Sequence, residues 1–205
     1  MRMNRRRMIG LGLGAAAAEA MAGAAWAQIT PLPEDLRDAL ERTPGTPVFG
    51  NPDGAVTLTE FFDYNCPFCR SSAGDLQRLI ADDADLRVVL REWPVFGEDS
   101  DFAAKAALAA HAQGKYAEFH LAMMNLKGMA DENTAMAMAR ETGIDPDRLR
   151  RDMEAPEVMD HINLSMALAG HLGLIGTPSY ICGNEIRFGR QTLSELQDLV
   201  GRARN

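Results

Sequence analysis

Two cysteines, Cys66 and Cys69, constrain the fold more than any other feature of the sequence, because they lie between a predicted strand and a predicted helix. Apolar and polar residues alternate over residues 55–62, which is typical of a strand. Residues 66–81 carry apolar side chains at helical spacing, and residues 86–93 again have strand character. This strand–helix–strand order is the beginning of a βαβ unit. It places the two cysteines at the first turn of the helix.

A long helical segment then interrupts the sheet-forming part of the chain. Residues 100–172 are predicted to be helical throughout. Strands follow at residues 179–182 and 185–188, and a helix at residues 192–202 closes the chain. Because strands occur on both sides of the helical segment, we expect an insertion into one α/β domain. The predicted units are an N-terminal helical extension at 28–46, a sheet-forming domain at 47–98 and 175–205, and an inserted all-helical domain at 99–174.

The first 27 residues are predicted to be a secretory signal peptide. Arginines crowd its start, an apolar run follows at residues 9–18, and residues 25–27 have the small-x-small pattern of a cleavage site. The apolar run is too short for a membrane anchor, which takes roughly 20 residues. The pair Arg5-Arg6 favours twin-arginine export, and the Sec route is the alternative. We therefore expect cleavage near Ala27 and export to the periplasm.

The charge balance excludes one class of partner. The whole chain has a formal net charge of −8, and removal of the arginine-rich segment would make the remaining chain more acidic. Nucleic acids and anionic membrane surfaces attract basic proteins rather than acidic ones. We therefore expect no nucleic acid among the partners of this protein.

The spacing of Cys66 and Cys69 predicts a chemical difference between them. Helix residues three apart are neighbours with Cβ atoms about 5–6 Å apart, which is compatible with a disulfide. Pro67 fits the first turn, where its missing N–H costs nothing. Cys66 is then expected to lie exposed at the helix N-terminus, whose positive dipole end stabilises a thiolate, whereas Cys69 lies one turn inside. This asymmetry favours Cys66 as the exchanging sulfur and Cys69 as the resolving sulfur.

Three kinds of site use a close pair of cysteines. A zinc site needs two further ligands, but only Cys182 is left and the four histidines form no pair at metal-binding spacing. An inert disulfide between Cys66 and Cys69 would close a loop too small to constrain the unfolded chain. The position between strand and helix in an exported chain favours a reactive redox pair. We expect Cys182 to be a buried free thiol.

Several motifs together resemble those of a known family. The stretch EFFDYNCPFCR at residues 60–70 is followed by the helical segment and then by Gly-Thr-Pro at residues 176–178. This combination resembles the DsbA family of thioredoxin-fold thiol–disulfide oxidoreductases. The resemblance extends from about Val48 to Arg202 and includes the inserted helical domain. It implies a thioredoxin-like fold that works without a cofactor or a metal.

The resemblance also implies how the surroundings of the cysteine pair act. It implies a cis peptide bond between Thr177 and Pro178 beside the disulfide, and binding of an extended substrate by these two residues together with Pro67 and Phe68. The best-known members carry histidine in place of Phe68. A cationic imidazole would further stabilise the thiolate of Cys66, which makes such a protein a stronger oxidant. Phe68 therefore predicts weaker oxidising power, with the same class of chemistry.

Glu60 is the third candidate catalytic residue. It lies six residues before Cys66, on a strand face whose other side chains are apolar. The resemblance implies that this acid lies beneath the disulfide, where burial raises its pKa and lets it exchange a proton with Cys69. Arg91, on the neighbouring strand, is a candidate charge partner for Glu60. The alternative for Arg91 is a solvated basic side chain.

These features predict an exported enzyme that introduces disulfides into reduced, unfolded proteins by exchange at Cys66-Pro67-Phe68-Cys69. The resemblance implies reoxidation by a DsbB-like membrane partner, and the short N-terminal extension favours a monomer. A disulfide isomerase or reductase is the alternative enzyme. A periplasmic chaperone or copper-handling module, which would use the two cysteines as soft ligands, is the non-enzymatic alternative.

Overall fold

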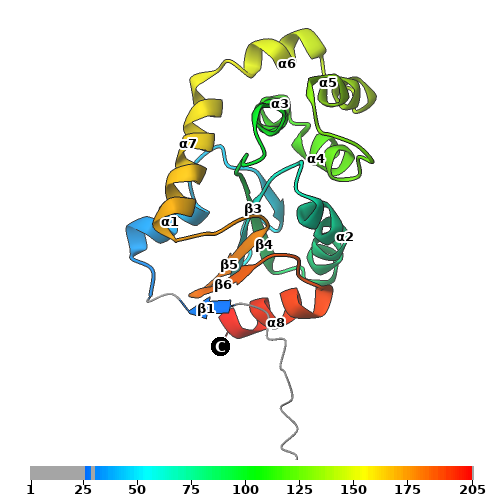
Figure 1. Cartoon of the computed structure of the whole chain (residues 1–205). Helices are drawn as coiled ribbons and strands as arrows, with labels where there is room; N and C mark the ends of the chain where they lie inside the picture. The colour runs from blue at the N-terminus through cyan, green and yellow to red at the C-terminus, as the bar shows by residue number, and fades with distance from the viewer. Residues whose placement is uncertain (1–25, 29–30, 205) are drawn as a thin grey trace, which may run out of the picture.

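The computed structural model describes residues 26–28 and 31–204. The predicted signal peptide therefore lies outside the described residues, except for Trp26 and Ala27. Among the described residues, no helix combines the length and the apolar character that crossing a membrane requires. Figure 1 shows a mixed sheet with helices packed on both faces and a further group of helices beyond one end of the strands.

The sheet has six strands, and its central strand leads directly into the cysteine pair. The strands are β1 (Trp26–Gln28), β2 (Val48–Gly50), β3 (Val56–Phe62), β4 (Leu86–Glu92), β5 (Ser179–Cys182) and β6 (Glu185–Phe188). Their order across the sheet is β1-β6-β5-β3-β4-β2. β3 and β4 pair in parallel, and the other neighbours pair antiparallel. β3 thus has a neighbour on each side, so the residues that follow it begin inside the molecule.

The sequence predicts β3, β4, β5 and β6 to within one residue at each end, and this part of the prediction is confirmed. It misses β1 and β2, which form the two edges of the sheet. Each has only three residues, too few to show an alternating pattern. β2 ends at Gly50, where the backbone φ is 73°, a conformation that favours glycine. A Cβ atom at this position would also lie only 2.5 Å from the carbonyl oxygen of Leu86.

Helices make up most of the rest of the described chain. They are α1 (Glu34–Glu41), α2 (Pro67–Asp82), α3 (Glu98–Ala112), α4 (Tyr116–Met124), α5 (Glu132–Glu141), α6 (Pro146–Asp152), α7 (Pro156–His171) and α8 (Leu193–Ala203). α3 to α7 lie between β4 and β5 in the chain, so the predicted helical insertion into an α/β fold is confirmed. The division of the chain into an extension, a sheet-forming domain and an inserted domain stays a prediction.

Side chains alternate along β3 between two hydrophobic cores. Leu58 and Phe62 belong to the larger core, which they share with residues of α2, α8 and the insertion. Phe61 belongs to a second core, which it shares with Leu40 of α1 and Leu168 of α7. Burial of one such side chain stabilises the fold by about 1.5–3 kcal/mol. Because both faces of β3 are covered, a polar side chain on this strand is buried as well.

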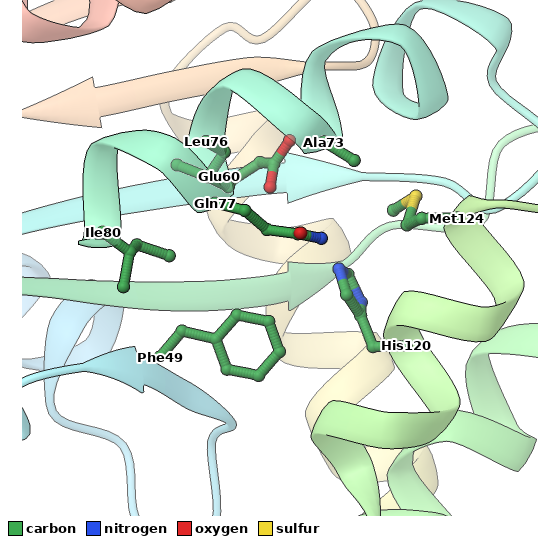
Figure 2. Close-up of a pocket in the computed structure, with 8 residues that line it drawn as sticks. All are labelled: Phe49, Glu60, Ala73, Leu76, Gln77, Ile80, His120 and Met124. Carbon is green, nitrogen blue, oxygen red and sulfur yellow. The ribbon is translucent and has the colours of Figure 1, made fainter. Parts of the chain in front are cut away.

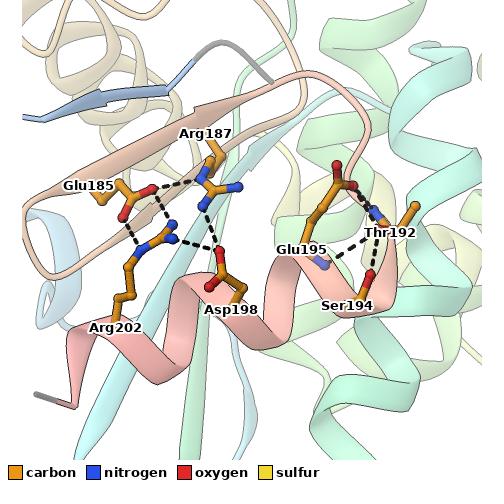
Figure 3. A network of polar contacts seen from close by, with 7 residues as sticks. All are labelled: Glu185, Arg187, Thr192, Ser194, Glu195, Asp198 and Arg202. Carbon is orange, nitrogen blue, oxygen red and sulfur yellow. Dashed lines mark hydrogen bonds and ion pairs between the residues drawn. The ribbon is translucent and has the colours of Figure 1, made fainter. Parts of the chain in front are cut away.

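A network of ion pairs attaches α8 to β6 (Figure 3). Arg187 of β6 contacts Glu185 at 2.7 Å and Asp198 of α8 at 3.1 Å. Arg202 of α8 contacts the same two carboxylates, each at 2.6 Å. At the other end of the helix, Thr192 forms the N-terminal cap. The ion pairs therefore hold α8 against the sheet, and the cap stabilises the start of the helix itself.

A buried ion pair attaches the helical insertion to the sheet. The carboxylate of Glu92, at the end of β4, lies 2.7 Å from Nε2 of His161 in α7. The same carboxylate accepts a hydrogen bond from the hydroxyl of Tyr116 in α4, and all three side chains are buried. Burial alone would raise the pKa of Glu92, but His161 and Tyr116 hold it below its usual value. Two helices of the insertion thus depend on one carboxylate.

We expect His161→Leu to lower the free energy of unfolding by about 3 kcal/mol, because it leaves a buried carboxylate without its ion-pair partner. Urea unfolding at neutral pH measures this loss. His171→Leu is the matched control, because His171 is exposed near the end of the same helix and its replacement should change stability by less than about 0.5 kcal/mol. Equal losses in the two variants would contradict the anchoring role of His161.

Candidate active site

The cysteine pair opens α2, as predicted. Cys66 is the N-cap residue of this helix and Pro67 is its first residue. The sulfur of Cys66 accepts a hydrogen bond from the backbone N–H of Cys69 at 3.4 Å. The backbone N–H of Cys66 donates to the carbonyl oxygen of Asp63 at 3.1 Å. The sulfur is thus held where the unpaired N–H groups of the helix end converge.

The segment before β5 lies beside this sulfur. The peptide bond between Thr177 and Pro178 is cis, which confirms the predicted isomer. The thiol of Cys66 donates a hydrogen bond to the carbonyl oxygen of Thr177 at 3.2 Å. The structure therefore brings the Cys66 turn and the Thr177-Pro178 turn together, although a long helical insertion separates them in the chain.

The two thiols differ in acidity, in the predicted direction. A hydrogen bond from Cys69 lowers the pKa of Cys66 to about 6, against the effect of burial, and the side chain of Thr177 and the backbone N–H of Phe68 contribute. Burial raises the pKa of Cys69, and the hydrogen bond to Cys66 and the charge of Glu60 raise it further. At neutral pH, Cys66 is therefore mainly a thiolate when Cys69 is a thiol.

The expected exposure of Cys66 is wrong. Both cysteines are only 1% exposed, and the carbonyl oxygen of Thr177 lies against the sulfur of Cys66. Cys66 differs from Cys69 in lining a surface groove that Cys69 does not line. Access to the pair is therefore through this groove.

The groove in front of Cys66 is apolar. Its most exposed side chains are Phe68, at 58%, and Ile175, at 81%. Val95 and Phe96 are exposed on the same groove. These residues come from the start of α2, the segment after β4 and the segment before β5, so the sequence alone does not bring them together. An exposed apolar patch beside a reactive sulfur is typical of an interaction site.

Glu60 lies beneath the pair, on the strand that leads to it. Its side chain is 3% exposed, and its Cα partner in β5 is Tyr180. Burial raises the pKa of Glu60 to about 7, the hydroxyl of Tyr180 lowers it in part, and the charge of Cys66 raises it again. A carboxyl that titrates near neutral pH and interacts with Cys69 can accept or donate a proton there.

The predicted charge partner of Glu60 is wrong. Arg91 pairs in register with Phe61, so its side chain lies on the opposite face of the sheet from Glu60. Arg91 is fully buried, and its guanidinium donates hydrogen bonds to the carbonyl oxygens of Ala39 and Leu40 at the end of α1. It is therefore neither a partner of Glu60 nor a solvated side chain.

A carboxylate absent from the sequence-based prediction, Asp63, holds the turn before the cysteines. It accepts hydrogen bonds from the backbone N–H groups of Asn65 and Val95, each at 2.7 Å. It also accepts from the backbone N–H of Phe96 at 3.2 Å and from the hydroxyl of Ser100 at 2.8 Å. In an Asx turn, an aspartate side chain accepts a hydrogen bond from the backbone N–H two residues later, as Asp63 does from Asn65. This turn pattern is the sequence signal that could have identified Asp63.

The remaining cysteine takes no part in this arrangement. Cys182 is buried in β5, and burial raises its pKa to about 12. Its role as a buried free thiol agrees with the sequence-based expectation. In the part of the chain that the structure describes, no three of the histidine, cysteine, aspartate and glutamate side chains gather as metal ligands would.

Comparison with known proteins agrees with this geometry. The family model described as DSBA-like thioredoxin domain matches residues 57–201. The crystal structure of a thioredoxin-like oxidoreductase from Silicibacter pomeroyi has 54% sequence identity and a TM-score of 0.81, and the match covers 82% of this chain and 97% of that chain. The thiol-disulfide exchange protein alpha-DsbA2 from Wolbachia pipientis has 30% identity and a TM-score of 0.77, covering 82% and 91%. The predicted thioredoxin-like fold is therefore confirmed.

Curated relatives match at lower identity. The probable disulfide bond formation protein D of Bacillus cereus is 26% identical over 149 residues, which are 66% of this chain and 69% of the relative. A Na(+)/H(+) antiporter NhaA of Herminiimonas arsenicoxydans is 28% identical over 134 residues, which are 64% of this chain and 21% of the antiporter. The chain spans 21% to 24% of the length of such antiporters, so that similarity concerns one segment of larger proteins.

We expect the thiolate absorbance of the reduced protein to appear with a midpoint near the lowered pKa of Cys66, about 6. A pH titration followed by ultraviolet absorbance measures it. Cys66→Ser should abolish this transition. Cys182→Ser should leave it unchanged, because that thiol ionises only at much higher pH. A transition that survives Cys66→Ser would mean that another thiol carries the low pKa.

Proposed function

This chain belongs to the family of DSBA-like thioredoxin domains, and from that premise we propose that it is an exported oxidase that introduces disulfides into folding proteins. Proteins of this family are thiol–disulfide oxidoreductases. The observation that carries the proposal is the difference in acidity between the two thiols. A pair in which one sulfur is a stable thiolate favours the reduced state of the enzyme, and so favours oxidation of the substrate.

The proposed reaction begins with the disulfide form of the enzyme. A substrate thiolate attacks the sulfur of Cys66, the Cys66–Cys69 bond breaks, and a mixed disulfide forms. Cys69 leaves with the electron pair and takes up a proton, because its pKa is raised. A second substrate thiolate then attacks the substrate sulfur of the mixed disulfide. Cys66 leaves as a thiolate, so the substrate loses two electrons and the enzyme gains them.

Glu60 is the proposed proton carrier for Cys69. Burial raises the pKa of this carboxyl to about 7, so it holds a proton in part of the molecules at neutral pH. In the forward direction it donates to Cys69 as the disulfide opens. In the reverse direction it accepts the proton that Cys69 must lose before it can attack a mixed disulfide.

The surroundings of the pair suit an unfolded protein as the substrate. We propose that the groove beside Phe68 takes up apolar side chains, and that the backbone at Thr177 and Pro178, beside Pro67, orients an extended segment across Cys66. Reduced exported proteins present such segments before they fold. Reoxidation requires a second redox protein, and we propose a DsbB-like membrane partner for a monomeric enzyme in the periplasm.

One observation favours the reverse direction as the second candidate. Phe68 supplies no cationic side chain beside Cys66, and its own side chain is turned to solvent. A less stabilised thiolate shifts a cysteine pair toward reductase or isomerase activity. The alternative function is therefore reduction or rearrangement of substrate disulfides by the same two sulfurs.

A redox titration against glutathione tests the direction. An oxidase has a more positive reduction potential than glutathione. We therefore expect Cys66 and Cys69 to be reduced even in buffers in which most of the glutathione is oxidised. A potential more negative than that of glutathione would favour the reductase. Cys66→Ser is the control, because it cannot form the disulfide and should show no transition.

We expect Glu60→Gln to slow only the step in which Cys69 loses a proton. Reduced enzyme reacts with oxidised glutathione in two steps, which rapid quenching resolves. Attack by Cys66 should keep its rate, whereas attack by Cys69 on the mixed disulfide should slow by about 10²-fold or less. Slowing of the first step alone would contradict the proton-carrier role.

Stability measurements on the same variant separate a catalytic from a structural role. The folded-state pKa of Glu60 is raised, so wild-type stability should fall as pH rises from the ordinary carboxyl range through about 7. Glu60→Gln lacks this loss, and the difference in unfolding free energy should grow in its favour with pH. A strongly destabilised Glu60→Gln at high pH would mean that the carboxylate is a structural ion-pair member.

A further inference from the structure

The residues on either side of the cysteine pair bind the same segment of the helical insertion. Asn65 precedes Cys66, and Arg70 follows Cys69. Both side chains reach residues 126–130, which connect α4 to α5. The residues of this segment are not among those that line the groove in front of Cys66, and the proposed reaction assigns no part to them.

Asn65 holds the end of the segment. Its side-chain oxygen accepts a hydrogen bond from the backbone N–H of Ala130 at 2.7 Å, and its side-chain nitrogen donates to the carbonyl oxygen of Ala130 at 3.3 Å. The same nitrogen donates to the hydroxyl of Ser100 at 3.0 Å, and that hydroxyl donates to Asp63. Ala130, which is fully buried, is therefore bound through both of its backbone polar groups to the residue that precedes Cys66.

Arg70 holds the beginning of the segment. Its Nε donates a hydrogen bond to the carbonyl oxygen of Tyr64 at 2.6 Å, in the turn before Cys66. Its Nη1 donates to the carbonyl oxygens of Gly128 at 2.6 Å and of Leu126 at 3.4 Å. A guanidinium presents several N–H donors in one rigid plane, which suits a site made of three carbonyl oxygens. Arg70 thus joins the cysteine turn directly to the insertion.

The helix that leads into the segment also packs near the cysteines. Met124, the last residue of α4, is only 3% exposed. Figure 2 shows that its side chain and Ala73 of α2 line the same small cavity. Because α2 begins at the cysteine pair, the segment starts from a helix end that is packed on the redox helix itself.

The side chain of Met129 stays exposed between these bonds. It is 55% exposed, whereas Met123 and Met124 of the same insertion are buried. The carbonyl oxygen of Met129 accepts a hydrogen bond from the hydroxyl of Thr134 in α5 at 2.8 Å. The backbone around Met129 is therefore fixed, and a contact group that is already in place loses less conformational entropy on binding. A methionine also adapts to partners of different shape.

We propose that Met129 is a specificity-determining residue that contacts an apolar side chain next to the reacting cysteine of the substrate, and that Asn65 and Arg70 are the positioning residues that hold it there. This role rests on the proposed function, in which an unfolded polypeptide crosses Cys66. Residues of an extended chain follow one another at about 3.3 Å. Because Ala130 is bonded to the residue before Cys66, the next position, Met129, lies within reach of the residues that flank the bound cysteine.

Two peptide substrates measure this contact. Each carries two reduced cysteines, flanked by leucine in one peptide and by serine in the other. The ratio of their second-order rate constants of oxidation cancels any loss that affects both peptides. We expect the wild type to prefer the leucine peptide. Met129→Ser should reduce this preference about fivefold, because apolar contact area is lost, and Met129→Leu should retain it.

Matched variants elsewhere in the chain are the controls. Met159→Ser should leave the ratio unchanged, because Met159 is an exposed methionine of α7. Arg70→Lys keeps the charge but cannot donate to three carbonyl oxygens in one plane, so it should also reduce the preference. Arg78→Lys, at an exposed arginine of the same helix, should not.

The outcomes separate this contact from the proposed function. An unchanged ratio in Met129→Ser, an equal fall in Met159→Ser, or a wild type without preference for leucine overturns the role of Met129. An unchanged ratio in Arg70→Lys overturns the positioning role of Arg70. If the wild type oxidises neither peptide but reduces their disulfide forms, the proposed direction is wrong, and the same ratio, read from reduction, decides the role of Met129.

Discussion

Alternation of side chains along β3 and β4 decides which groups meet at the cysteine pair. β3 has a neighbouring strand on each side and helices on both faces, so consecutive residues enter different cores. Glu60 faces α2 and the cysteines, and Phe61 faces α1. The same period places Arg91 on the far face, where it binds the end of α1. The carboxyl of Glu60 therefore interacts with the hydroxyl of Tyr180 and not with a cation from the sheet, and burial raises its pKa.

The parts of the fold that the sequence predicts are those with local signals. The spacing of Cys66 and Cys69, the proline between them and the change from strand to helical periodicity all act within a few residues. The three-residue edge strands carry too little pattern to be recognised. The sequence predicts Glu60 as the partner of Arg91 from the adjacency of two strands, and adjacency does not say to which face a side chain points. Register supplies that information, and register is a property of the folded sheet.

The site depends more strongly than the fold on contacts between distant segments. The carbonyl oxygen of Thr177 reaches Cys66 across the whole insertion, and Asp63 binds backbone groups at Val95 and Phe96. These contacts cover Cys66, which the sequence places at an exposed helix end, and leave the groove as its access. They also fix the groove wall to the turn that carries the sulfur. The same few bonds therefore bury the sulfur of Cys66 and hold the wall of the groove beside it.

The predicted cleavage site lies within the short strand β1, so cleavage there would change the edge of the sheet. β1 pairs antiparallel with β6 through Trp26, Ala27 and Gln28, and the predicted cleavage site falls between the last two. Processing at that site would remove two of the three pairs and leave the backbone of β6 as an open border of the sheet. The precursor and the processed enzyme would then differ in which strand edge they offer to other chains. Cleavage at the predicted site would thus change one edge of the sheet, at the opposite side of β5 from β3.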